Sequence, residues 1–339
     1  MNSKERLYKV LKGEVVDRPP CICPGGMMNM IIEDVMDIEN VSWPEAHTNP
    51  IMMADLTQGM HKNNAFENFG VPFCMTVEAE GMGATVYMGT KNTEPRVTKY
   101  PIESSEEYTK LENIDVNKGR AKVVIDAIKI LKKRSKEVPI IANLTGPVSL
   151  ASSLLEPMIY YKEIRKKPEK VHKLMEFVTN NLIIFGKAQL EAGADILTIS
   201  DPSGTGEILG ANNFNEFAVP YLNKIIDELN VYAKGGTIIH ICGRLKSIYK
   251  ELNLLHSDAI SFDSITSVTQ VKENVLNKAI MGNISTFALE NSDVKSLETM
   301  CNTCLKNGVD ILSPACGVGV RTKLDNIKVL KECAKNYSR

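Results

Sequence analysis

Short apolar segments recur along the chain and are separated by segments with the periodicity of amphipathic helices. The apolar segments are rich in Ile, Val and Leu without polar alternation, which is typical of strands buried on both faces. Predicted strands lie near Cys21 and at residues 71–75, 139–144, 196–200, 237–242, 259–262, 279–282 and 309–313. Between them, apolar residues from Val171 to Phe185 follow helical spacing, and Gly193 is the predicted stop.

Strand–helix alternation that ends in eight strands predicts an α/β fold, a parallel (β/α)8 TIM barrel, with a doubly wound open sheet as the main alternative. Residues 84–100 alternate differently and are predicted to form an inserted hairpin. No linker rich in Pro, Gly or Ser divides the chain. Residues 1–339 are therefore predicted to form a single barrel domain, with a largely helical N-terminal extension over about residues 1–70.

Composition narrows the possible functions of the 339-residue chain. Its 40 Lys and Arg residues balance 41 Asp and Glu residues, so nothing favours nucleic-acid binding through a broad basic surface. No apolar run approaches the roughly 18–20 residues that span a bilayer, and no signal peptide is evident, so we expect a cytoplasmic protein. Its 8 cysteines are then expected to be reduced, as metal ligands, nucleophiles or core residues.

The predicted strand at residues 237–242 contains the most informative pair of side chains. His240 and Cys242 are two residues apart, so they share one face of the strand, and Gly243 ends it. Cys316 follows the last predicted strand, and in a barrel the strand ends form the catalytic rim. One imidazole and two thiolates suit zinc with a fourth position open, although packing of these residues in the core is an equal alternative.

Other cysteines and histidines give weaker signals. Cys301 and Cys304 have C-x-x-C spacing, but they lie in a helical pattern in which both thiols are predicted to face the core. His47 lies in a turn-rich segment that either closes over a site or caps a turn.

At this point the sequence resembles a known family. The pattern His240-x-Cys242, followed after 73 residues by Cys316, resembles the zinc site of the methylcobamide:coenzyme M methyltransferases, in the uroporphyrinogen decarboxylase-like superfamily of barrels. The likeness covers nearly the whole chain. The methanol-type enzyme is particularly similar in residues 43–50, 88–92, 97–98, 146–148, 191–195, 200–202 and 240–243.

The resemblance implies transfer of a methyl group from a methylated corrinoid protein to the thiol of coenzyme M. It implies two cofactors, Zn²⁺ and a methylcobamide that the partner protein carries, because the chain lacks the Asp-x-His-x-x-Gly motif of corrinoid carriers. Alternatives are another acceptor or donor (another thiol, tetrahydrofolate, methanol or a methyl ether) or another uroporphyrinogen decarboxylase-like function. Porphyrinogen decarboxylation is disfavoured, because residues 23–28 lack the paired arginines of that enzyme.

Two carboxylates are predicted to act at the site. Asp263 follows the strand next to that of His240, and the resemblance places a labile carboxylate ligand there, usually Glu. Asp263 is therefore expected to be the resting fourth zinc ligand, or else to hydrogen-bond His240 as the outer partner of a metal ligand. Asp201, at the end of another strand, is a candidate to bind substrate or orient the ligands.

The sulfonate of coenzyme M requires a cationic or N–H-rich pocket. Candidate substrate-binding residues are Arg18, Arg244 and Lys91, with Asn283 just past a strand end. The corrinoid protein is expected to dock over the barrel mouth. Its docking surface could include the methionines at positions 27, 28, 30 and 36, although packing in the core is the favoured interpretation of these residues.

Overall fold

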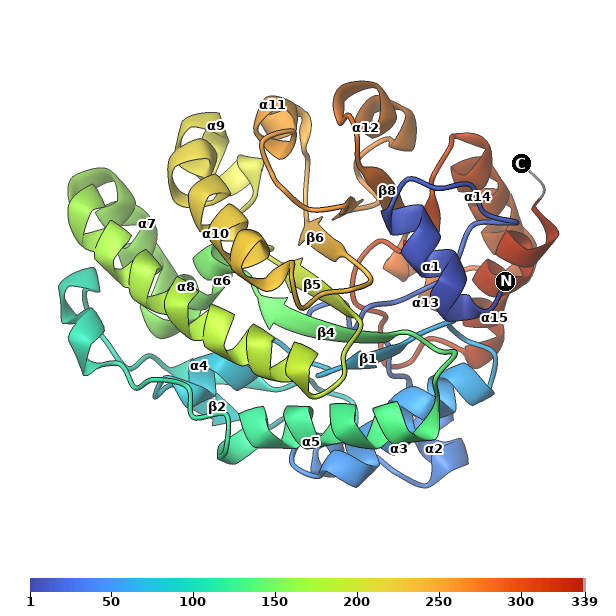
Figure 1. Cartoon of the computed structure of the whole chain (residues 1–339), viewed down its shortest axis with the longest axis horizontal. Helices are drawn as coiled ribbons and strands as arrows, with labels where there is room; N and C mark the ends of the chain where they lie inside the picture. The colour runs from blue at the N-terminus through green and yellow to red at the C-terminus, as the bar shows by residue number, and fades with distance from the viewer. Residues whose placement is uncertain (338–339) are drawn as a thin grey trace.

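A computed structural model describes residues 1–337, and it has the predicted α/β architecture (Figure 1). A curled parallel sheet has the strand order β1-β4-β5-β6-β7-β8-β9, and helices surround it. Its strands are β1 (Phe69–Val71), β4 (Ile140–Thr145), β5 (Ile196–Ser200), β6 (Thr237–Ile241), β7 (Ala259–Phe262), β8 (Ala279–Ile284) and β9 (Ile311–Pro314). All neighbouring pairs are parallel, so the carboxyl ends of the strands meet at one rim.

The segment at Cys21 bridges the two edges of this sheet. Cys21 pairs in parallel with Leu312 of β9, and its carbonyl accepts a hydrogen bond from the N–H of Glu67, just before β1. The predicted eighth strand therefore occupies the eighth position in the barrel, although it forms only an isolated bridge. Pro19, Pro20 and Pro24 flank it, and proline has no N–H with which to extend a ladder.

Most predicted strands are present, and two match residue for residue, β5 and β7. The strand predicted at residues 71–75 overlaps β1 only at Val71: β1 begins two residues earlier and ends four residues earlier, because Pro72 ends it. Gly70 of β1 was missed as a strand residue. A Cβ atom there would lie 1.9 Å from the carbonyl oxygen of Pro24, so glycine permits the close approach that seats the Cys21 segment.

The helices complete the barrel and its extension. The α-helices are α1 (Ser3–Leu11), α2 (Glu33–Glu39), α3 (Pro50–Lys62), α4 (Val77–Gly81), α5 (Gly119–Arg134), α6 (Pro147–Leu154), α7 (Pro157–Lys166), α8 (Pro168–Glu191), α9 (Gly206–Phe217), α10 (Val219–Leu229), α11 (Tyr249–Leu252), α12 (Val268–Asn274), α13 (Thr286–Asn291), α14 (Val294–Lys306) and α15 (Leu324–Asn336). Short 3₁₀ helices are η1 (Glu45–His47), η2 (Ser105–Lys110) and η3 (Lys246–Ile248). The predicted hairpin is present as β2 (Thr85–Tyr87) and β3 (Arg96–Lys99), which pair antiparallel.

Helix α1 lies at the end of the barrel where the strands begin. A capping box between Asn2 and Glu5 starts this helix. Lys4 then binds the carboxylate of Asp195, directly before β5, at 2.6 Å. Buried apolar residues from Leu7 to Ala334 form one connected hydrophobic core. The polar side chains of the candidate site lie at the opposite end of the barrel from α1, where the strands end.

Within residues 1–337, the structure has no helix both long enough and apolar enough to cross a membrane.

Candidate metal centre

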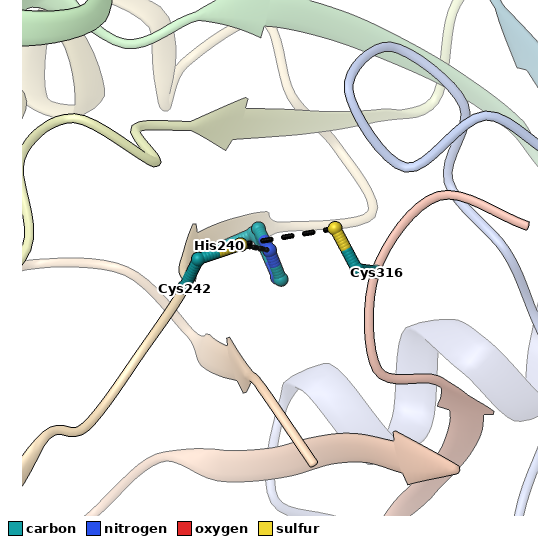
Figure 2. Close-up of side chains that lie close together, drawn as sticks. All are labelled: His240, Cys242 and Cys316. Carbon is teal, nitrogen blue, oxygen red and sulfur yellow. Dashed lines mark hydrogen bonds between the residues drawn. The ribbon is translucent and has the colours of Figure 1, made fainter. Parts of the chain in front are cut away.

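Strand β6 and the segment after β9 bring three potential metal ligands together at the carboxyl rim. The ligand atoms of His240, Cys242 and Cys316 all lie within 4.8 Å of one another (Figure 2). The His240 Nε2 atom lies 3.0 Å from the Cys242 sulfur, which lies 3.8 Å from the Cys316 sulfur. The structure thus brings together the three residues that the sequence predicted to converge, while the binding of a metal there stays a prediction.

The burial of these residues gives the group a closed side and an open side. His240 is fully buried inside the barrel, whereas Cys242 and Cys316 are each partly exposed. The two sulfurs therefore lie between the buried imidazole and the mouth of the barrel. Solvent therefore reaches the group at the two cysteines and not at the imidazole.

The two thiols are electrostatically unequal. The pKa of Cys316 is lowered to about 4: the hydrogen bond from the Cys242 thiol is the largest cause, burial opposes it, and His240 and the N–H of Gly317 add to the lowering. The same contact raises the pKa of Cys242. The first negative charge of the pair is therefore held on Cys316, and a metal cation would remove the second thiol proton.

Ser261 orients the imidazole, a role that the sequence reasoning missed. It lies opposite His240 in the register between β6 and β7, and its hydroxyl is 2.9 Å from His240 Nδ1. The alternative prediction that Asp263 hydrogen-bonds His240 is wrong, because Ser261 occupies that position. Metal-binding histidines commonly use the second ring nitrogen in this way.

Asp263 lies beside the group formed by His240, Cys242 and Cys316 and is not one of its members. Its carboxylate accepts hydrogen bonds from the N–H groups of Gly243, at 3.4 Å, and Ile265, at 3.1 Å. Its charge contributes to the raised pKa of Cys242, so the two side chains are neighbours. The structure places Asp263 within the surroundings of the candidate centre, and its direct ligation of zinc stays a prediction.

With this geometry described, comparisons with known proteins identify the family. The family model "Uroporphyrinogen decarboxylase (URO-D)" matches residues 2–337. The chain belongs to this family. Methylcobamide:CoM methyltransferase MtbA of Methanosarcina acetivorans is 34% identical over 98% of both chains, and MtaA of Methanosarcina barkeri is 31% identical over 98% of both. A solved methyltransferase from Methanosarcina mazei has a TM-score of 0.92 at 32% identity, covering 99% of this chain and 98% of that one. The predicted resemblance is confirmed.

In this member of the URO-D family, Asn283 serves the site indirectly. Its side-chain amide donates to the carbonyl oxygens of Asp263, at 3.1 Å, and Thr266, at 2.7 Å. Both amide hydrogens are therefore used to hold the loop that carries Asp263. The predicted substrate-binding role of Asn283 is replaced by a positioning role.

Asp201 is also placed differently from its prediction. It is completely buried, and its carboxylate accepts hydrogen bonds from the N–H of Val148 and from the N–H and hydroxyl of Ser149. These groups belong to the first turn of α6, whose N-cap residue, Gly146, has no side chain to offer. Asp201 therefore caps a helix from a neighbouring strand, and these hydrogen bonds occupy both oxygens of its carboxylate.

The predicted sulfonate ligands are distributed over the molecule. Arg18 precedes Cys21, which pairs with Leu312, so it lies near the beginning of the strands, opposite the rim that carries Cys316. Its guanidinium makes two bonds to the carboxylate of Glu67, at 2.6 and 3.0 Å. A role for Arg18 in binding substrate at the centre is incompatible with this position.

Lys91 and Arg244 are both exposed and paired with acids. Lys91, in the turn of the β2–β3 hairpin, contacts Asp37 and Glu33 of α2. Arg244 follows Cys242 by two residues and pairs with Glu207 of α9 at 3.3 Å. Of the three predicted cationic residues, Arg244 is the one that the chain places directly beside a candidate metal ligand.

The hairpin also supplies a residue that the sequence reasoning missed. Glu94 is solvent-accessible, yet its pKa is raised to about 7, chiefly because the surrounding protein desolvates the carboxylate and in smaller part because of the nearby Cys74 and Cys316. This effect places Glu94 near the candidate centre. Its position on an irregular turn gave no signal in the sequence.

Two predictions about buried residues are settled by the packing. Met28, Met30 and Met36 are buried, so core packing is confirmed for these three, and Met27, which is half-buried, is the one of the four that keeps exposed surface for a docking partner. Cys301 and Cys304 are buried on α14, as predicted. His47 is also buried, packs against Trp43 and Phe73, and has a pKa lowered to about 3 by burial.

Proposed function

We propose that this protein transfers a methyl group from a methylated corrinoid protein to the thiol of coenzyme M at a zinc ion held by His240, Cys242 and Cys316. The observation that carries the proposal is the meeting of these three ligand atoms within 4.8 Å at the carboxyl rim of the barrel. Relatives named methylcobamide:CoM methyltransferases, aligned over 98% of the chain, support the reaction type.

The donor set fits zinc on chemical grounds. Nitrogen and sulfur ligands suit this ion, and three protein ligands leave a fourth position for a substrate. Two thiolates and a neutral imidazole bring two negative charges, so the loaded site is electrically neutral. Both cysteines are free thiols, as such ligation requires.

Zinc bound at these residues supplies a positive charge that makes a substrate thiol ionise near neutral pH, where an ordinary thiol of pKa about 8.5 is mostly protonated. In the transfer, a carbon–sulfur bond forms as the cobalt–carbon bond breaks. The electron pair of that bond stays on cobalt, and the thiol proton goes to solvent. The chain contributes by burying His240 beneath the two thiols, so that donor and acceptor meet at the mouth of the barrel.

Zinc analysis of wild type and Cys316→Ser, purified under reducing conditions, tests the proposal. We expect close to one zinc per chain in wild type and much less in Cys316→Ser, with methyl transfer from methylcobalamin to coenzyme M lost. Cys333→Ser, a cysteine on α15 that is not part of the three-residue group, is the matched control and should retain both zinc and activity. Wild-type zinc far below one per chain, or full zinc in Cys316→Ser, would overturn the proposal.

The identity of the methyl acceptor and of the methyl carrier is tested in the same assay. We propose coenzyme M as acceptor and a carrier loaded from methanol as donor. Coenzyme M is compared with other thiols and with tetrahydrofolate, and carriers loaded from methanol are compared with those loaded from other methyl compounds. A higher kcat/KM with another acceptor or carrier would replace that part of the proposal. We further propose that the protein works in the cytoplasm, where free cysteines are kept reduced.

A further inference from the structure

Helices α14 and α15 pack side by side near the C-terminal end of the chain (Figure 1). A groove of about 430 Å³ lies between them, and all of its lining residues come from these two helices. Cys333 of α15 is part of its wall and keeps 9% of its surface exposed, whereas Cys301 of α14 has no exposed surface. A small dissolved molecule can therefore reach Cys333 directly and Cys301 only through it.

The thiols of Cys301 and Cys333 meet across the helix interface and share a hydrogen bond. This hydrogen bond lowers the pKa of Cys333, against the opposing effects of burial and of the charges of Glu298 and Glu332, and it raises the pKa of Cys301. The first negative charge of the pair is therefore held on the thiol that the groove exposes. Because the thiolate is the reactive form of cysteine, Cys333 is the nucleophile of the pair and Cys301 is its buried partner.

Two further cysteines lie near Cys301, but the structure does not place either of them against Cys333. The thiol of Cys304 donates to the carbonyl oxygen of Gly282 on β8, at 3.4 Å. Cys21 has no exposed surface and does not line the groove. Cys301 is therefore the cysteine in contact with the accessible thiol.

We propose that Cys301 and Cys333 form a redox pair, which oxidants of the peroxide class convert into a disulfide by entering the groove. The Cys333 thiolate attacks one oxygen of hydrogen peroxide and the O–O bond breaks, which leaves a sulfenic acid on Cys333 and a hydroxide that takes up a proton. The sulfur of Cys301 then forms the S–S bond, and the hydroxyl of the sulfenic acid leaves as water. Two thiols and one peroxide thus give one disulfide and two waters, and a dithiol reductant reverses the reaction.

The disulfide would tie α15 to α14 and close a loop that contains β9 and Cys316. Such a cross-link stabilises a protein mainly by restricting its unfolded chain, so the oxidised form should have a Tm about 5 °C above that of the reduced form. The inference does not rest on the proposed function, because neither cysteine belongs to the three-residue group of the candidate centre.

The experiment treats the fully reduced protein with hydrogen peroxide, alkylates the remaining thiols and maps the unreduced digest by tandem mass spectrometry, which separates this link from any at Cys242 or Cys316. Cys301→Ser removes the partner thiol, and Cys304→Ser, one turn further along α14, is the matched control. We expect a Cys301–Cys333 disulfide in wild type and in Cys304→Ser, with Tm raised by about 5 °C and the change reversed by dithiothreitol. In Cys301→Ser, Cys333 should stop at the sulfenic acid, which dimedone traps.

Should Cys301→Ser fail to fold, the link mapped in wild type decides the question without it. A Cys333 that stays unoxidised, or that links to Cys304 or Cys21, would overturn the inference. A Cys301–Cys333 disulfide that leaves Tm unchanged would overturn the tie between the two helices. None of these results alters the zinc content expected of the reduced protein, so this inference and the proposed function fail separately.

Discussion

Replacing Asp201 by alanine separates a structural role from a catalytic one. The sequence predicts Asp201 to be a catalytic carboxylate at a strand end, whereas in the structure it caps the first turn of α6. A catalytic residue can be removed with little change in stability and a large loss of turnover. Removal of a buried helix cap instead lowers stability strongly and changes the turnover of the folded protein little.

The hydrogen bonds of Asp201 give the expected magnitude. The carboxylate accepts from Val148 N at 3.1 Å, Ser149 N at 2.8 Å and the Ser149 hydroxyl at 2.6 Å, all in a buried environment. Each buried donor left without a partner costs about 1–3 kcal/mol, and loss of a helix cap costs about 1 kcal/mol. The Ser149 hydroxyl can rotate to another acceptor. The two N–H groups cannot, so we expect Asp201→Ala to lose about 4 kcal/mol.

Urea unfolding of zinc-loaded wild type, Asp201→Ala and Ser149→Ala measures the effect, with turnover measured on the same samples under conditions where each is folded. Ser149→Ala removes one donor without orphaning the carboxylate, so it should be milder, at about 1 kcal/mol. The double variant should lose less than the sum of the two, because the single variants share a hydrogen bond. If Asp201→Ala kept its stability within about 1 kcal/mol and lost turnover 100-fold, the capping argument would be refuted and the catalytic prediction restored.

Further predictions concern the remaining polar residues. Arg18→Met removes both guanidinium bonds to the buried Glu67 and leaves it the N–H of Cys21 at 2.9 Å and Arg6 at 3.8 Å. It should lose about 3 kcal/mol in urea unfolding with KM for coenzyme M unchanged; a raised KM would contradict the assigned position. Burial raises the pKa of Glu67, but the hydrogen bonds from Arg18 and the Cys21 N–H, with the charges of Arg18 and Arg6, together outweigh it and the net pKa is lowered. The stability from this pair is therefore present above pH 4.5 and is lost as pH falls through the lowered pKa. Glu67→Gln should flatten that part of the urea-midpoint curve, and an unchanged curve would contradict it. Asn283→Ala should lower kcat about 10-fold at unchanged zinc content, whereas lost zinc would show that its loop holds the metal. Arg244→Ala should raise KM for coenzyme M about 10-fold if this residue binds the sulfonate, and an unchanged KM would exclude that role.

The barrel and the candidate centre were predictable because both follow from strand periodicity. A run of apolar residues without alternation predicts a strand buried on both faces, and parallel strands bring their carboxyl ends to one rim. The two-residue spacing of His240 and Cys242 then predicts a shared face, and the position of Cys316 after the last strand predicts the same rim. The structure bears out each of these geometric steps.

The partners of the charged side chains were not predictable in this way. A position at a strand end indicates a rim location, but it does not indicate which donors lie nearby. The carboxylate of Asp201 lies next to the beginning of α6 because β4 and β5 are adjacent, with α6 directly following β4. Arg18 illustrates the same limit: it precedes the strand predicted at Cys21, which indicates the beginning of the strands, but nothing in the sequence indicated that Glu67 would be its partner.

The role of Ser261 was not predicted, although the sequence did contain a signal for it. It is the one polar residue in the four-residue strand Ala259–Phe262, and a buried hydroxyl without a partner is costly. The strand before it in the chain contains a histidine on the inner face, and consecutive strands of a barrel are neighbours. A lone hydroxyl in one strand and a lone imidazole in the next are therefore expected to satisfy each other. The position of Met28 depends instead on an irregular loop after the Cys21 segment, and no periodicity in the sequence determines where such a loop places its side chains.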